Sequence, residues 1–208
     1  MNVGGPFRSG SGRRQRQKQR VTVLFRSKRE RHYHRFGINC FNIPENVYGK
    51  DSKSYALLTG GRDGSIHNWR VSLDSGDQIK DGTLGQPQWV QSLEGHTGWV
   101  SSLVSFRVHQ RAQTWTIASS SHDGNIKIWR VRKSVSDEDR ISRCFYTLRG
   151  HTDYVRGMQY SQMDGRLVSA GADQRIVLWD LTSLEAVREM QGGNTVRPVG
   201  TFTQEARY

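Results

Sequence analysis

Residues Ile117–Trp129 read IASSSHDGNIKIW and decide the fold, because two other segments of the chain repeat their pattern. The copies are Leu57–Trp69 (LLTGGRDGSIHNW) and Leu167–Trp179 (LVSAGADQRIVLW), so the tryptophans lie 60 and 50 residues apart. Each copy has a run of small and apolar residues, an aspartate, and a tryptophan six residues later. Recurrence at a spacing of this order is typical of repeat proteins such as propellers and solenoids.

Each copy has the pattern of a strand, a tight turn and a second strand. In Ile117–Trp129 the turn is His122-Asp123-Gly124, and polar and apolar residues alternate after it, as in a strand with one buried face. Asp-Gly suits the backbone of a short hairpin turn. Four flanking segments also have strand patterns, namely His96–Leu103 and His151–Met158 upstream, and Trp89–Leu93 and Cys144–Leu148 downstream. Four short strands per repeat make up a propeller blade, so we predict an all-β fold.

These motifs resemble the WD-repeat (transducin-β-like) β-propellers. In that family a histidine, a serine or threonine, the turn aspartate and the tryptophan of each blade form a hydrogen-bonded tetrad. The resemblance implies three tetrads: His96, Ser119, Asp123 and Trp129; His151, Ser169, Asp173 and Trp179; and His34, Thr59, Asp63 and Trp69. The first set departs from the pattern, because Tyr33 stands where the other two have glycine. A buried imidazole needs partners for both ring nitrogens, which this arrangement supplies.

The length of the chain predicts only part of a ring. A blade takes about 40–45 residues, so the seven blades usual in the family need on the order of 300 residues, and only three copies of the repeat are visible in this chain. We predict a truncated propeller with about three blades, at residues 34–93, 94–148 and 149–190, within a repeat region of residues 21–190. Residues 191–208 are expected to be an irregular tail. The segments Asn46–Ser54, Ser72–Gln88, Val108–Thr114 and Arg132–Arg143 read as surface loops, and Val21–Phe25 as the strand that closes the ring in this family.

The net charge of +12 is concentrated at the N-terminus. Through residue 35 there are eleven basic side chains and one acidic side chain, so this part carries +10 of the +12. We predict that residues 1–20, which include the cluster RRQRQKQR at 13–20, form a basic disordered leader. Three further interpretations stay open: a nuclear import signal, a nucleic-acid contact through residues 8–35, and a mitochondrial presequence, for which the segment lacks an apolar helical face.

Several classes of protein are disfavoured by composition. No run approaches the ~18 apolar residues of a membrane span, and there is no secretory signal. The two cysteines, Cys40 and Cys144, are far apart, which argues for buried thiols rather than a disulfide scaffold. The His and Asp residues lack the spacing of metal ligands. We therefore expect an intracellular protein, in the cytoplasm or nucleus or both, without a metal, a cofactor or a membrane partner.

The tetrads contain Ser, His and Asp, the residue types of a hydrolytic triad. An enzyme needs one such set at one site, whereas here the set recurs with a tryptophan that no triad requires. The chain also has neither a Gly-x-Ser-x-Gly nucleophile motif nor a phosphate-binding loop. We predict that the protein is not an enzyme and that the chain has no catalytic residues.

The resemblance implies a partner-binding face at the loops of the tetrad histidines and at the turns before the aspartates. By position, this face would contain Arg35, Arg62, Thr97, Trp99, His122, Thr152, Asp153 and Tyr154, with Ala172 beside them. Trp, Tyr and Arg are the residue types that dominate interface energies. The alternative for Trp99 and Tyr154 is partial burial between blades.

Two functional hypotheses follow. Roughly residues 20–190 are similar to the WD-repeat cofactors that activate ubiquitin-specific proteases, through RVTVLF (20–25), GIN (37–39), GRD (61–63), HTGWV (96–100), HTDYV (151–155), SAGAD (169–173) and WDLTSL (179–184). This similarity implies a non-catalytic adaptor that binds and regulates a deubiquitinase. The alternative is an RNA- or ribosome-associated WD-repeat protein that uses its basic leader for phosphate contacts.

Overall fold

The computed structural model describes residues 33–45, 47, 54–72, 87–107, 114–132, 141–182 and 200–203. Residues 1–20, the segment Val21–Phe25 and most of the four expected loops lie outside the described residues. The strands are β1 (Ile38–Asn42), β2 (Ser54–Gly61), β3 (Ile66–Ser72), β4 (Gln88–Glu94), β5 (Val100–Phe106), β6 (Thr114–Ser121), β7 (Asn125–Arg132), β8 (Ile141–Arg143), β9 (Tyr146–Arg149), β10 (Val155–Ser161), β11 (Arg166–Gly171), β12 (Arg175–Asp180) and β13 (Gly200–Thr203).

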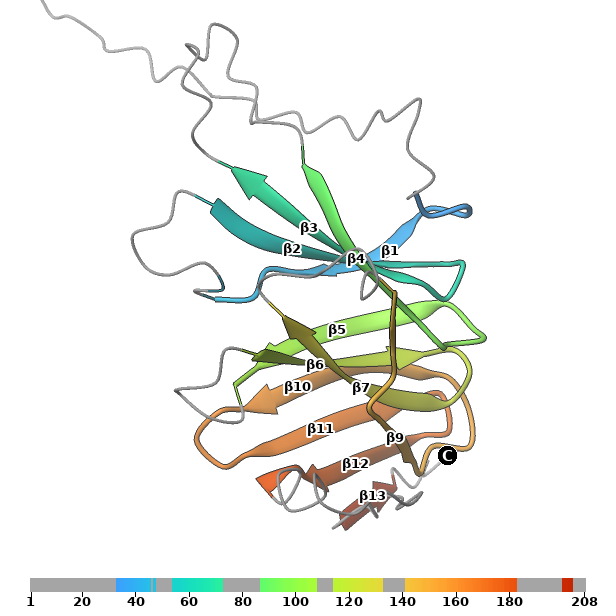
Figure 1. Cartoon of the computed structure of the whole chain (residues 1–208). Helices are drawn as coiled ribbons and strands as arrows, with labels where there is room; N and C mark the ends of the chain where they lie inside the picture. The colour runs from blue at the N-terminus through green and yellow to red at the C-terminus, as the bar shows by residue number, and fades with distance from the viewer. Residues whose placement is uncertain are drawn as a thin grey trace, which may run out of the picture.

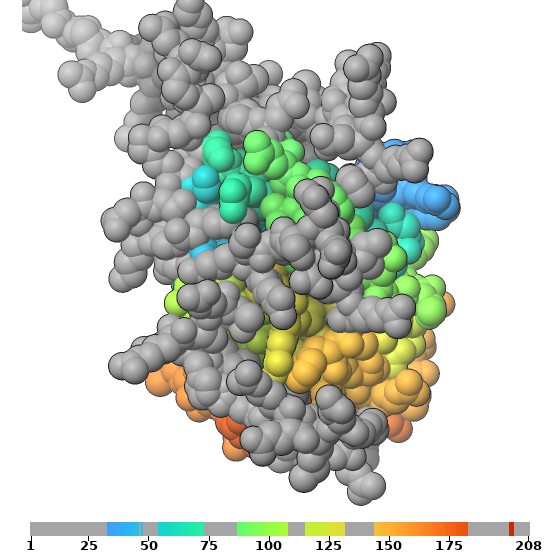
Figure 2. Space-filling model, in the orientation of Figure 1, coloured from blue at the N-terminus to red at the C-terminus, as the bar shows by residue number. Residues whose placement is uncertain are grey.

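The strands form three sheets, one for each copy of the repeat. Four antiparallel strands make up each sheet, in the orders β1-β2-β3-β4, β5-β6-β7-β9 and β10-β11-β12-β13, and β8 adds a parallel strand to the edge of the first. The sheets lie one after another as a fan of blades (Figure 1). In the space-filling view the colours run from blue to red down a single body, so blades that adjoin in sequence adjoin in space (Figure 2). The predicted all-β fold with about three blades is confirmed.

Two expectations about the ends of the blades are wrong. Residues 191–208 were expected to be irregular, but Gly200–Thr203 form β13 and pair with β12, with Thr201 opposite Val177. The segment Arg132–Arg143 was expected to be a loop, but Ile141–Arg143 form β8 beside β4. Both are short edge strands, which need only backbone hydrogen bonds and therefore leave little pattern in the sequence. Cys144, expected within a strand, lies between β8 and β9.

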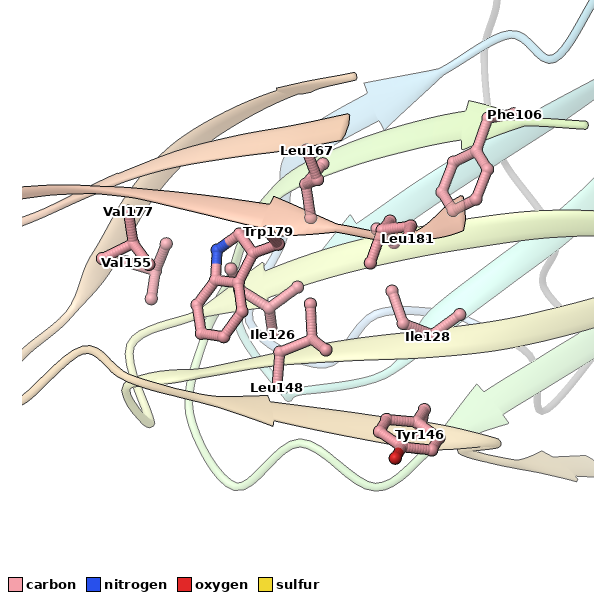
Figure 3. Packing of buried hydrophobic residues seen from close by; sticks show 11 residues of the cluster. Phe106, Ile126, Ile128, Tyr146, Leu148, Val155, Leu167, Val177, Trp179 and Leu181 are labelled. Atoms are coloured by element: carbon pink, nitrogen blue, oxygen red, sulfur yellow. The ribbon is translucent and has the colours of Figure 1, made fainter. Parts of the chain in front are cut away.

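The hydrophobic core consists of two layers, one at each junction between blades. One layer joins Leu58 and Ile66 of the first blade to Ile117 and Trp129 of the second. The other joins Ile126, Ile128 and Leu148 of the second blade to Leu167, Val177 and Trp179 of the third (Figure 3). Because side chains alternate along a strand, each middle strand of the second blade serves both layers. Every blade is therefore stabilised mainly by its neighbours.

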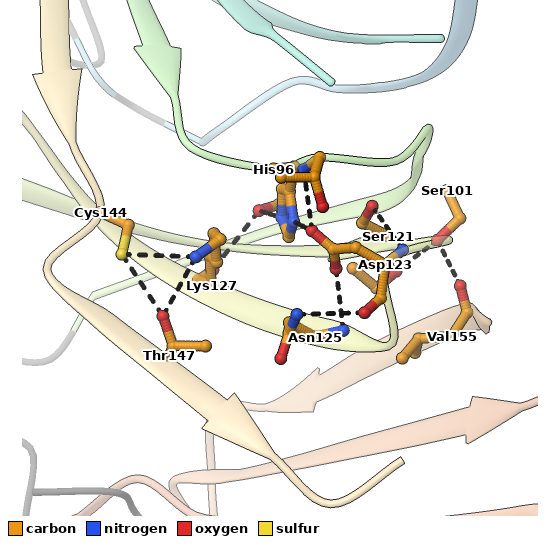
Figure 4. Close-up of polar contacts among 12 residues, drawn as sticks. His96, Ser101, Ser121, Asp123, Asn125, Lys127, Cys144, Thr147 and Val155 are labelled. Carbon is orange, nitrogen blue, oxygen red and sulfur yellow. Dashed lines mark hydrogen bonds and ion pairs between the residues drawn. The ribbon is translucent and has the colours of Figure 1, made fainter. Parts of the chain in front are cut away.

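The inner strands β1, β5 and β10 also join the blades through polar contacts. Asn39 Nδ2 donates to the carbonyl oxygen of Val100 at 2.9 Å. At the next junction the Ser101 hydroxyl donates to the carbonyl oxygen of Val155 (Figure 4). Asn39 and Ser101 are the second residues of β1 and β5, so equivalent positions of successive blades make equivalent hydrogen bonds to the next blade. Each inner strand has an irregular register at this point, typical of a β-bulge.

The turn after Asp63 limits how closely the second blade can approach the first. Gly64 and Gly124 have positive φ angles of 79° and 77°. A Cβ atom on Gly64 would lie 2.6 Å from the carbonyl oxygen of His96 in the next blade. Glycine is thus required at residue 64 by both conformation and space. The third copy has Gln174 at this position, with φ of 61°.

Candidate functional site

The second blade holds a continuous chain of hydrogen bonds from its turn to its core, and Figure 4 shows the part of it around His96 and Asp123. His96 Nδ1 lies 2.8 Å from the Asp123 carboxylate and His96 Nε2 lies 2.8 Å from Ser119 Oγ. The indole N–H of Trp129 donates to the same Ser119 oxygen at 2.7 Å. The set is satisfied if His96 Nδ1 donates to the carboxylate and the Ser119 hydroxyl donates to His96 Nε2.

The other two blades repeat this chain. In the third, His151 lies 3.0 Å from the Asp173 carboxylate and 2.8 Å from Ser169 Oγ, and Trp179 donates to Ser169 at 2.9 Å. In the first blade, His34 contacts the Asp63 carboxylate at 3.1 Å and Thr59 Oγ1 at 2.9 Å, and Trp69 donates to Thr59 at 2.9 Å. The structure therefore brings together all four residues of each set, including His34 behind Tyr33.

The first blade extends its tetrad with residues that sequence reasoning missed. The Ser65 hydroxyl donates to the Asp63 carboxylate at 2.7 Å. The ring of His67 lies 4.3 Å from the ring of His34, and its Nδ1 is 2.8 Å from Ser92 Oγ. The available signal was the spacing, because residue 67 lies two before Trp69 and hence on the same face of β3.

The tetrads are part of the core rather than of an open cleft. The side chains of His96 and His151 are 0% exposed, and Ser119 and Ser169 are buried. A hydroxyl held between an imidazole and an indole at such a depth is not in contact with solvent. Among the described residues, no group of three or more His, Cys, Asp or Glu side chains is placed to hold a metal ion.

Hydrogen bonding keeps the tetrad carboxylates ionised. Burial alone would raise the pKa of Asp63, but bonds from the Ser65 hydroxyl, the Arg35 N–H and His34 outweigh burial and lower it to about 2. The pKa of Asp123 is likewise lowered, because the bond to His96 and its charge outweigh burial. For Asp173 the bond from the Thr152 N–H is the largest of the contributions that lower the pKa against burial. Each blade thus carries one carboxylate that favours the folded state when ionised.

We expect acid to destabilise the protein between about pH 4 and pH 2. The folded-state pKa of Asp63, at about 2, lies below its ordinary value of 3.8, so its stabilising contribution is present above that ordinary value and is lost as the pH falls through 2. Urea denaturation at successive pH values measures this loss. Asp63→Asn should show a smaller loss, whereas Asp153→Asn, which removes an exposed carboxylate without a histidine partner, should behave as the wild type. An equal pH dependence in Asp63→Asn and the wild type would contradict the assignment.

Burial also sets the chemistry of the cysteines. Both are free thiols and both are half-buried rather than fully buried. Burial of Cys40 against the next blade raises the pKa of its thiol to about 12. Cys144 Sγ lies 3.8 Å from Lys127 Nζ and 3.5 Å from Thr147 Oγ1 (Figure 4).

Four of the residues assigned to the partner-binding face form a stack across all three blades. The guanidinium carbon of Arg62 lies 4.8 Å from the centre of the Trp99 ring. The rings of Trp99 and His122 are stacked at 5.3 Å, and those of His122 and Tyr154 at 4.7 Å. Trp99 is 44% exposed and Tyr154 is 49% exposed. We call Arg62, Trp99, His122 and Tyr154 the stacked ladder.

The other four residues of that face are anchored mainly through their backbone. The N–H groups of Arg35, Thr97 and Thr152 donate to the carboxylates of the tetrad aspartates in their blades, at 2.8, 3.1 and 3.0 Å. Asp153 accepts a 2.7 Å bond from the N–H of Tyr154. Their side chains are exposed and are not part of the stack. They flank the stacked ladder through the loops that carry it.

No helix among the described residues is long and apolar enough to cross a membrane. Residues 87–130 and 142–180 match the protein-family model for the WD domain, G-beta repeat. The first match contains the whole tetrad of the second blade, and the second match that of the third. The second and third blades therefore match the WD repeat, and the three sheets together have the arrangement of adjoining propeller blades.

Proposed function

We propose that the protein is a non-catalytic scaffold that binds a protein partner through the face containing the stacked ladder. WD repeats generally serve as protein-interaction scaffolds, and the repeat architecture presents loops from several blades on one surface. The observation that carries the proposal is the exposure of Trp99 and Tyr154, which a purely structural role in the core would not require. The Ser, His and Asp residues of the tetrads are scaffolding in this proposal.

We propose further that the partner is a ubiquitin-specific protease and that binding raises its activity. This finer assignment rests on the similarity of residues 20–190 to the WD-repeat cofactors of such proteases. RNA binding is the second candidate, and it is favoured by the eleven basic side chains among the first 35 residues.

Affinity purification with mass spectrometry tests both candidates. The double variant Arg62→Ala/Trp99→Ala should lose the protease that the wild type retains, by at least tenfold, because it removes two of the residue types that dominate interfaces. Its circular dichroism should stay native, since both side chains are exposed. Deletion of residues 1–20 should leave a protein partner bound but remove most RNA. Unchanged recovery of every partner with the double variant would refute the proposed face.

A further inference from the structure

The backbone determines which side chains enter the stacked ladder. The N–H groups of Arg62, His122 and Ala172 donate to the carbonyl oxygens of Gly37, Trp99 and Tyr154, at 3.1, 2.9 and 2.7 Å. Each blade thus places one turn residue beside one loop residue at the same point. Between blades, the turn residue lies against the loop residue of the next blade, as Arg62 does on Trp99 and His122 on Tyr154. The ladder ends where these positions hold Gly37 and Ala172, which have no large side chain.

Most aromatic ring faces of the stacked ladder are in contact with other members of the ladder. Trp99 has the Arg62 guanidinium and the His122 ring as neighbours, and His122 has Trp99 and Tyr154. Single-stranded nucleic acids bind protein by stacking bases on open aromatic faces. In this ladder Trp99 and His122 each have two stacking neighbours and Tyr154, at the end of the stack, has one, so the surface offers few open ring faces to bases. Its exposed edges are the electropositive part of an aromatic ring.

Every member of the ladder has a polar group that can donate a hydrogen bond: the Arg62 guanidinium and the Trp99 indole N–H only donate, and the His122 ring and the Tyr154 hydroxyl can donate or accept. In the part of the chain that the structure describes, neither the indole N–H of Trp99, the ring of His122, the hydroxyl of Tyr154 nor the guanidinium of Arg62 makes a hydrogen bond. A guanidinium stacked on an indole keeps its in-plane N–H groups available for a carboxylate. Arg35, whose N–H binds the aspartate next to Arg62, adds a second exposed cation at this end.

We infer that the stacked ladder binds an extended acidic peptide segment, with a carboxylate on Arg62 and further carboxylate or carbonyl oxygens along the ring edges. The inference rests on the proposed function and names the chemical class of its partner. A row of unpaired groups that can donate, beside a cation, complements acceptor-rich carboxylates, and edge-on contact needs no free ring face.

Fluorescence anisotropy with the full chain tests this inference. The probe is a labelled eight-residue peptide of alternating Glu and Gly, compared with the same peptide carrying Gln and with an oligouridylate of eight nucleotides. We expect Arg62→Gln to weaken the Glu peptide about tenfold, as for loss of a charge-assisted hydrogen bond. Trp99→Leu should also weaken it. Arg166→Gln removes the same charge from an exposed residue at the opposite end of β11 from the turn, and should change affinity less than twofold.

Three results would overturn the inference: equal loss in Arg62→Gln and Arg166→Gln, equal binding of the Gln peptide, or an equal effect of Arg62→Gln on the oligouridylate. Circular dichroism checks that each variant is folded. If Trp99→Leu does not fold, the result for Arg62→Gln alone decides the test. If the Glu peptide does not bind but recovery of the purified partner still depends on Arg62 and Trp99, the proposed function stands and the inference of an acidic partner segment is wrong. If the Glu peptide binds as expected while partner recovery is unchanged in the double variant, the proposed function fails instead.

Discussion

Trp129→Ala should lower the free energy of unfolding by about 3–5 kcal/mol, the usual cost of truncating a buried tryptophan. Trp129 is 0% exposed and packs in the layer between the first and second blades. Its loss leaves a cavity in that layer and removes the N–H that satisfies Ser119. Since each blade depends on its neighbours, the loss should affect the whole unfolding transition. Urea denaturation followed by circular dichroism measures it.

Two other substitutions separate the causes of this effect. Trp129→Phe keeps most of the apolar contact but lacks the indole N–H, so its cost should be intermediate. Trp99→Ala removes the same residue type from the exposed ladder, where Trp99 is 44% exposed, and should cost about 1 kcal/mol or less. Equal costs for Trp129→Ala and Trp99→Ala would show that the core layer is not the source of stability.

Asp123→Ala should cost about 3 kcal/mol, the second largest effect, because several groups lose one acceptor together. His96 Nδ1 and the N–H groups of Thr97 and Asn125 all bond to this carboxylate, at 2.8, 3.1 and 2.9 Å. The His96 side chain is fully buried, so its N–H would have no water to replace the carboxylate. Thermal or urea denaturation at pH 7 measures the loss.

A double-mutant cycle with His96→Ala identifies the interaction responsible. The two residues are in direct contact, so we expect a coupling energy of about 1–3 kcal/mol. Asp153→Ala serves as the matched control, because Asp153 is exposed and, among the described residues, accepts a hydrogen bond only from the adjacent Tyr154 N–H. Additive costs of Asp123→Ala and His96→Ala would rule out the tetrad as a coupled unit.

The fold and the tetrads were accessible from the sequence because both depend on short-range spacing. The six residues from Asp123 to Trp129 encode one turn and one strand, and the place of His34 followed from counting four residues back from Ile38. The strands β8 and β13 were not accessible. They pair at sheet edges through backbone atoms, and their side chains carry no alternation that distinguishes them from a loop.

The candidate site was predictable as a set of positions but not as a stack. The repeat pattern indicates that Trp99, in the loop before β5, and His122, in the turn after β6, belong to the same blade. The contact of Arg62 with Trp99 depends instead on how far one blade is rotated against the next, and no local pattern encodes that angle. The pair His67 and Ser92 was missed for a similar reason, because its two residues lie 25 positions apart in the sequence.

Backbone hydrogen bonds join each turn to the loop of its own blade, so the path of the chain at this surface does not depend on which side chains it carries. Ala172 donates its N–H to Tyr154 just as Arg62 and His122 donate theirs, although the three side chains have nothing in common. Evolution can therefore change what these positions display without altering the path of the chain. Gly37 is the exception, since its φ of 93° restricts the position to glycine. Ala172 has no positive φ and therefore does not share this restriction.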